Sequence, residues 1–314
     1  MGMLMNHNPF FIISGAMKSG TTWLHESLGQ LPEIYIPREE VHLFDCKDPT
    51  VHPEFHKLNK SGLQLADERY LLKKEIFSPI GSSVKVGLDS STLFHSKISF
   101  SKLAQRMPDT RFVVLLRDPV MRAYSHYWHL VRTGRARFCF EKELLYGKQE
   151  ILHRSIYVDQ VNRFKLALKE KVYFVCYEQM FADPEKVLSE LLLFLDLPPS
   201  SLGLLLSQLK KQSNPGRYPR FMPGWLLGSR LLSGLERGRY AKEIEGEKIS
   251  LLNRSKYIGY VFKLYMMALL AGGVVRKKPK MRLETRNSLC CFFKEANEGL
   301  DDLLGNSFSR WWYH

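Results

Sequence analysis

The start of the chain joins an apolar strand, a loop of small residues and a helix within 20 residues. Residues 10–15 (FFIISG) are rich in aromatic and β-branched side chains, which is typical of a buried strand. The next loop contains Lys18 and Gly20, and Thr21 opens a segment whose apolar residues recur at helical spacing. Backbone N–H groups at a helix N-terminus and a nearby lysine both favour a bound anion. The pattern therefore predicts a phosphate-binding loop, and its alternative is a loop that only packs against its own helix.

The position of the lysine distinguishes this loop from one well-known kind of phosphate-binding loop. In the GxxxxGK[ST] loop of ATP- and GTP-hydrolysing proteins the lysine directly follows the second glycine. Here Lys18 precedes Gly20 by two residues. A phosphoryl-transferring P-loop protein also needs an acidic strand end for Mg²⁺, and no convincing one is present. The sequence therefore argues against a P-loop kinase or hydrolase.

A second motif, VVLLRDP, ends the strongest predicted strand, residues 111–116. Arg117 comes directly after that strand, and Ser125 lies about two turns into the helix predicted for 120–132. Ligands of open α/β sheets bind beyond the carboxyl ends of the strands, where an arginine can hold a phosphate bidentately. The alternative is that Arg117 only pairs with Asp118 or Glu178.

Apolar strands alternate with helices along most of the chain, which predicts an α/β fold with a central parallel sheet covered by helices on both faces. Strands are expected at 83–88, 111–116 and 172–177, and helices at 63–79, 97–106, 120–132 and 184–195. No linker separates two cores, so we expect a single P-loop-like domain over residues 1–314, with a helical, basic insertion at about 203–276. Residues 281–312 are expected to form one helix with a tryptophan-containing tail.

The net charge of +14 favours an anionic ligand, an anionic polymer or an acidic membrane surface over a neutral partner, although a generally basic surface would also explain it. Five cysteines show no CxxC spacing, so no metal site is expected. The absence of a signal sequence predicts a cytoplasmic location. The most apolar stretch, 257–275, is interrupted by Lys263 and is too short to span a bilayer, so membrane contact is at most peripheral.

The loop KSGTTW resembles the 5′-phosphosulfate loop of sulfotransferases that use 3′-phosphoadenosine-5′-phosphosulfate (PAPS), and RDP followed by RAYSHYW resembles their 3′-phosphate motif. The chain as a whole resembles bacterial stand-alone enzymes and the heparan-sulfate and carbohydrate group of that family. The resemblance implies PAPS as cofactor and 3′,5′-adenosine bisphosphate as product. The cofactor-binding residues it implies are Lys18, Ser19, Gly20, Thr21, Thr22, Trp23, Arg117 and Ser125, with Arg276, Lys277 and Lys278 from a loop ahead of the C-terminal helix.

The catalytic residues implied by the resemblance are Lys18, which would neutralise the leaving phosphate, and a proton acceptor. The segment EEVHLFD resembles the one that supplies a catalytic glutamate in the heparan-sulfate group, and it places Glu40 on that glutamate and His42 two residues later. In the same group a lysine follows the strand that here ends in GLDSSTLF, and this chain has Asp89 instead. Glu40, Asp89 and His42 therefore all remain candidate bases, in that order.

The resemblance implies transfer of a sulfuryl group from PAPS to a hydroxyl or amine of a glycan or of a small-molecule natural product, as in secondary metabolism. Nucleic acid is not an expected partner. The alternative is a catalytically impaired protein of the same fold that binds an anionic partner, which the missing lysine at Asp89 favours.

Overall fold

The computed structural model describes residues 10–37, 84–96, 100–209, 216–235 and 251–313. These residues divide into two compact units, which we describe one at a time. The first unit takes its residues from 1–122, 156–213 and 292–314, and the second from 123–155 and 214–291. The expectation of one domain with an insertion at about 203–276 stays a prediction.

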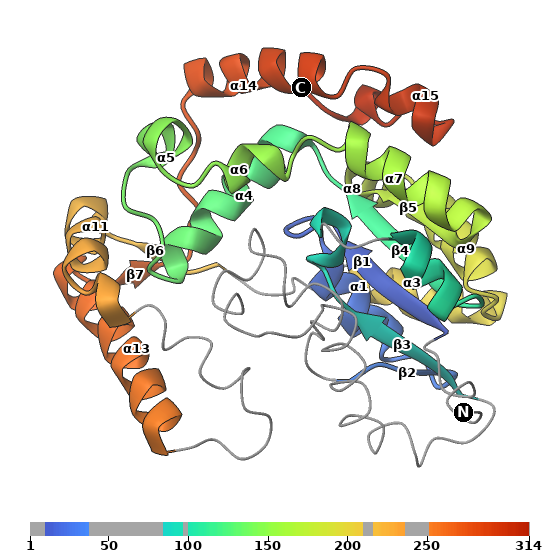
Figure 1. Cartoon of the computed structure of the whole chain (residues 1–314), viewed down its shortest axis with the longest axis horizontal. Helices are drawn as coiled ribbons and strands as arrows, with labels where there is room; N and C mark the ends of the chain where they lie inside the picture. Colours follow the sequence, from blue (N-terminus) through green and yellow to red (C-terminus); the bar gives the residue numbers. More distant parts are fainter. Residues whose placement is uncertain (1–9, 38–83, 97–99, 210–215, 236–250, 314) are drawn as a thin grey trace. The chain divides into compact units, whose positions relative to one another are not determined.

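The first unit is built on a five-stranded sheet in which every strand pairs in parallel with its neighbours. Its strands are β1 (Phe11–Gly15), β2 (Ile34–Tyr35), β3 (Lys85–Asp89), β4 (Arg111–Leu116) and β5 (Val172–Cys176). Their order is β2-β3-β1-β4-β5, so β1 lies at the centre between β3 and β4 (Figure 1). The carboxyl ends of these parallel strands therefore meet at one edge, the edge where ligands bind in such sheets.

Helices cover both faces of this sheet. They are α1 (Thr21–Leu28), α3 (Phe100–Arg106), α7 (Val158–Leu168), α8 (Tyr177–Ala182), α9 (Pro184–Phe194), α10 (Leu202–Leu209) and α15 (Leu300–Leu304). Successive strand side chains point to opposite faces, so Phe112 packs in a core with α3 and α7, whereas Val113 packs in a second core with α1 and α9. The predicted α/β fold with both sheet faces covered is confirmed.

Two helices begin in one unit and end in the other: α4 (Pro119–Arg132) and α14 (Leu283–Ala296). The remaining elements of the second unit are α5 (Phe140–Tyr146), α6 (Glu150–His153), β6 (Tyr218–Pro219), α11 (Met222–Leu231), α13 (Leu251–Leu270) and β7 (Val274–Val275). Helix α11 packs against α13, and β6 pairs with β7 in antiparallel fashion. None of the helices in the described parts of the chain is long and apolar enough to cross a membrane.

The prediction of one helix over 281–312 is wrong. Helix α14 ends at Ala296, and Gly299 takes a φ of 76° before α15 begins. Gly305 then closes α15 with a φ of 65°. Left-handed backbone interrupts an α-helix and suits glycine, so these two residues divide the segment into two helices and a final turn. The helix predicted at 63–79 lies outside the described residues.

Candidate active site

The loop between β1 and α1 is a tight turn fixed to the neighbouring strand. The backbone N–H of Ala16 donates to Leu115 of β4 at 2.7 Å, and Ser19 N–H donates back to Ala16 at 3.0 Å. Lys18 has a φ of 71°, an uncommon value for a residue with a side chain, and Gly20 has a φ of 98°. A Cβ atom at Gly20 would lie 2.8 Å from the Tyr177 ring, so only glycine fits there.

The loop presents polar groups that the described structure leaves without partners. Gly20 caps α1 without a side-chain hydrogen bond, and the first helical bond runs from Leu24 N–H to the Gly20 carbonyl at 3.1 Å. The N–H groups of residues 21–23 therefore precede the helical ladder. The Ser19 hydroxyl is buried and has no hydrogen-bond partner among the described residues. Buried polar groups are normally paired, so this arrangement fits an anion such as a phosphate.

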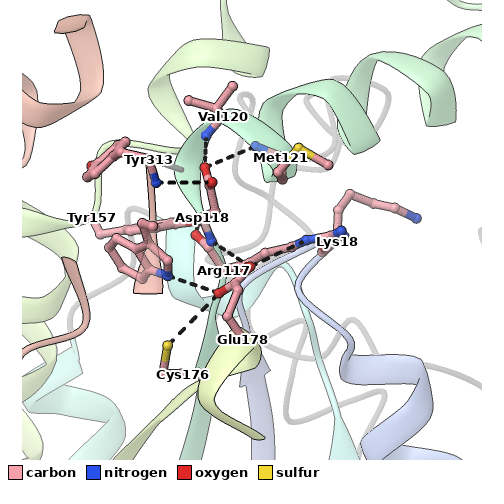
Figure 2. Close-up of polar contacts among 10 residues, drawn as sticks. Lys18, Arg117, Asp118, Val120, Met121, Tyr157, Cys176, Glu178 and Tyr313 are labelled. Carbon is pink, nitrogen blue, oxygen red and sulfur yellow. Dashed lines mark hydrogen bonds and ion pairs between the residues drawn. The ribbon is translucent and has the colours of Figure 1, made fainter. Parts of the chain in front are cut away.

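Arg117 follows β4 and lies beside this loop (Figure 2). Its Nη1 donates to the Lys18 carbonyl at 3.4 Å, and its guanidinium lies 4.7 Å from the centre of the Tyr177 ring. Its Nε is 3.9 Å from Glu178 Oε1, which makes an ion pair but is too long for a hydrogen bond, and this buried Nε has no hydrogen-bond partner among the described residues. The guanidinium is thus held in place and still has donor capacity for an anion.

Glu178 connects the Arg117 segment to the end of the chain. Its Oε1 accepts a hydrogen bond from Asp118 N–H at 3.1 Å, and its Oε2 accepts one from Trp312 Nε1 at 2.9 Å. Burial raises the pKa of Glu178, because removal from water disfavours the charged carboxylate, although the Asp118 N–H opposes this shift. The Tyr157 hydroxyl donates to the Arg117 carbonyl at 2.9 Å. Figure 2 shows these contacts converging around Arg117.

We expect Glu178→Gln to destabilise the fold by about 1–3 kcal/mol, because the amide has one acceptor oxygen for two donors. Denaturant unfolding of the two proteins measures this loss.

The pH dependence of stability gives a second measurement of the role of Glu178. A raised folded-state pKa means that the folded protein binds more protons, so the contribution of Glu178 is fully present below the unfolded-state pKa and declines as pH rises through the folded-state value. The stability of the variant should lack this decline. If the stability of the two proteins depended on pH in the same way, the raised pKa of Glu178 would be contradicted.

Asp89 ends β3 and is almost completely buried. Its Oδ2 lies 3.2 Å from Nδ1 of His25, which comes from α1. His25 was not among the residues predicted from the sequence, although it stands four residues after Thr21 and so shares a helix face with the start of α1. The candidate base Asp89 is thus one member of a His–Asp pair at the edge of the sheet.

Arg122 is a second residue to which the sequence analysis gave no role. Its side chain is fully buried, and its Nη1 donates to the Met17 carbonyl of the loop at 3.5 Å. Arg122 follows Arg117 by five residues in RDPVMR, and this nearby second arginine was the sequence feature that could have identified it. A second arginine thus contacts the backbone of the loop between β1 and α1.

The other predicted residues fall elsewhere. Glu40 and His42 lie outside the described residues. Ser125 is half-buried on α4, in the part of that helix that belongs to the second unit. The segment 276–279 of the same unit contacts the neighbouring Tyr124, whose hydroxyl donates to the Pro279 carbonyl at 2.9 Å and whose ring centre lies 4.7 Å from Lys278 Nζ.

A parallel sheet with a short glycine-containing loop and a helix start after its central strand defines a P-loop-like α/β protein. The model of the sulfotransferase family matches residues 9–201, which is more than half of the chain. The chain therefore belongs to the sulfotransferase family.

Individual relatives are distant. The chain is 22% identical, over 95% of its length, to the mouse bifunctional heparan sulfate N-deacetylase/N-sulfotransferase 4, and 22% identical over 94% to the human enzyme 3. It spans 30% of the length of each of these relatives. The crystal structure of a sulfotransferase from Alicyclobacillus acidocaldarius superposes with a TM-score of 0.61 at 20% identity, covering 98% of this chain and 99% of that one. This similarity shows the shared fold.

Proposed function

We propose that this protein is a PAPS-dependent sulfotransferase that sulfates a hydroxyl or amine of a glycan or of a small-molecule natural product. The observation that carries the proposal is the contact between Arg117 and the Lys18 carbonyl. Through this contact Arg117, which is predicted to bind the 3′-phosphate, lies next to the loop that is predicted to bind the 5′-phosphosulfate. Two buried donors, the Ser19 hydroxyl and Arg117 Nε, lack hydrogen-bond partners among the described residues there.

The residues present fit PAPS, which when bound supplies an activated sulfuryl group. The N–H groups at the start of α1 and the Ser19 hydroxyl would hold the 5′-phosphosulfate, and Arg117 would hold the 3′-phosphate. Lys18 would place a positive charge where negative charge develops on the departing phosphate. The cofactor roles predicted for Ser125, Arg276, Lys277 and Lys278 stay predictions, as does a cytoplasmic location.

A proton must leave the acceptor during transfer, and we propose Glu40 as the base that takes it. Asp89 is the second candidate. Its Oδ2 already contacts His25 Nδ1, so in this role it would act as one member of a pair. His42 is the third candidate.

The acceptor class is supported by the relatives, two of which are named as heparan sulfate N-sulfotransferases. We therefore place a glycan first among the acceptor classes.

Transfer of labelled sulfate from PAPS to a panel of glycans and small hydroxyl or amine compounds tests the proposal, with Lys18→Ala as the inactive control. Label in an acceptor with the parent chain alone supports the enzyme. Tight binding of 3′,5′-adenosine bisphosphate without transfer to any acceptor would instead support the alternative, a catalytically impaired binding protein. The aspartate at position 89 is the sequence feature that points to this alternative.

Arg117→Ala should weaken binding of 3′,5′-adenosine bisphosphate by about thirty- to a thousandfold, since a charge-assisted bidentate contact contributes about 2–4 kcal/mol. Titration calorimetry measures the change. Arg163→Ala on α7 is a matched control, because that arginine stacks on the Phe100 ring and contacts Gln160, away from the loop. If Arg117→Ala bound the nucleotide as tightly as the control, the 3′-phosphate site would lie elsewhere.

A further inference from the structure

Helix α13 of the second unit presents apolar side chains on two opposite faces. One face is buried and includes Met267, together with Lys263, whose ammonium donates to the Gly134 carbonyl at 2.8 Å. The other face is exposed and consists of Ile258, Val261, Phe262, Tyr265 and Leu269. These five residues follow one another at spacings of three, one, three and four, so they form one stripe along the helix, about 16 Å long. We call them the α13 stripe.

Other large apolar side chains are also exposed in the same part of the sequence. Most of the large apolar side chains that are exposed in the described parts of the chain lie between residues 216 and 283. Besides the stripe they include Leu227 and Leu231 on α11, which packs against α13 and is drawn beside it in Figure 1. Concentrated exposure of large apolar residues marks an interaction surface, whereas isolated exposed residues do not.

The same segments are strongly basic, with a net charge of +11. Residues 216–235 contain three arginines, residues 251–283 contain eight lysines or arginines, and neither segment contains an aspartate or glutamate. The net charge of the whole chain is +14. Lys256 is exposed just before the stripe, and Arg276 and Lys277 are exposed just after α13, beyond the turn at Gly272. Exposed basic side chains therefore occur in the sequence both before and after the stripe.

We propose that this surface docks onto a bilayer that contains anionic lipids, with the α13 stripe entering the headgroup boundary and the basic residues binding the headgroups. A helix with an exposed apolar face and lysine or arginine beside it has the composition of an interfacial helix. An anionic polysaccharide would satisfy the charges but leave the stripe in water. A second copy of the chain would cover the stripe but bring like charges together.

Sedimentation of the full chain with lipid vesicles tests this proposal. We expect binding to vesicles that contain phosphatidylglycerol, weak binding to phosphatidylcholine vesicles, and a decrease as salt is raised. Phe262→Glu should lower the partition coefficient by about tenfold or more, because it puts a charge into the stripe. Leu166→Glu is the control, since Leu166 is 72% exposed on α7 of the first unit. Circular dichroism and thermal unfolding check that both variants fold.

Three results would overturn the proposal. One is the absence of binding to the phosphatidylglycerol vesicles. Another is equal binding by Phe262→Glu and the parent chain, and the third is an equal loss in Leu166→Glu. If Phe262→Glu still sedimented with anionic vesicles and heparin displaced it, the surface would be a polyanion site and not a membrane site. The test uses no PAPS, so its outcome is independent of the proposed activity.

Discussion

Lys18→Ala should reduce sulfuryl transfer by about a hundredfold or more, because removal of one preorganised charge from a developing oxyanion typically has an effect of that size. The loop itself should survive. Its main-chain bonds, Ala16 to Leu115 and Ser19 to Ala16, do not involve the lysine side chain, and the Lys18 carbonyl that Arg117 contacts is retained. Initial rates with labelled PAPS measure the loss.

Lys171→Ala is the matched control, since Lys171 is an exposed lysine between α7 and β5. Its rate should equal that of the parent chain. A Lys18→Ala rate within a few-fold of the parent, with the fold intact, would contradict the role assigned to this residue.

The second large effect concerns the base. Glu40→Gln should lower the turnover rate by about 10²–10⁴-fold and leave binding of 3′,5′-adenosine bisphosphate unchanged, because the amide keeps the size of the side chain but cannot accept the proton. Single-turnover rates and calorimetry on the same preparations separate the two quantities.

Asp89→Asn is the comparison variant. Because Asp89 is buried and contacts His25 at 3.2 Å, this change should also lower stability, so unfolding is measured alongside the rate. If Asp89→Asn folds and abolishes turnover while Glu40→Gln retains it, Asp89 is the base. If both variants turn over normally, neither carboxylate accepts the proton.

The parts of the site predicted from the sequence are those fixed by local pattern. A buried strand followed by small residues and a helix start predicts a tight loop that contains Lys18 and Gly20, and the structure has such a loop between β1 and α1. Its role in anion binding stays a prediction. The alternation of strands and helices predicts parallel strands whose carboxyl ends meet, and Arg117 was placed at the carboxyl end of one of them. In the structure its Nη1 contacts the Lys18 carbonyl.

The remaining contacts depend on packing between residues far apart in the chain. Trp312 donates to Glu178 across 134 positions, and His25 meets Asp89 across 64. No periodicity or spacing encodes such pairs, because they form only when helices dock onto the sheet. The break at Gly299 is different. A glycine within a helical pattern indicates a possible helix end, but helical spacing continues on both sides of Gly299, and this spacing led to the prediction of one helix.

The proposed 3′-phosphate site is tested by comparing the binding of 3′,5′-adenosine bisphosphate with that of adenosine 5′-monophosphate, because the two nucleotides differ only in the 3′-phosphate. We expect the parent chain to prefer the bisphosphate by about thirtyfold or more, and Arg117→Ala to bind both nucleotides with similar affinity. Equal affinity of the parent chain for the two nucleotides would contradict a PAPS site at Lys18 and Arg117.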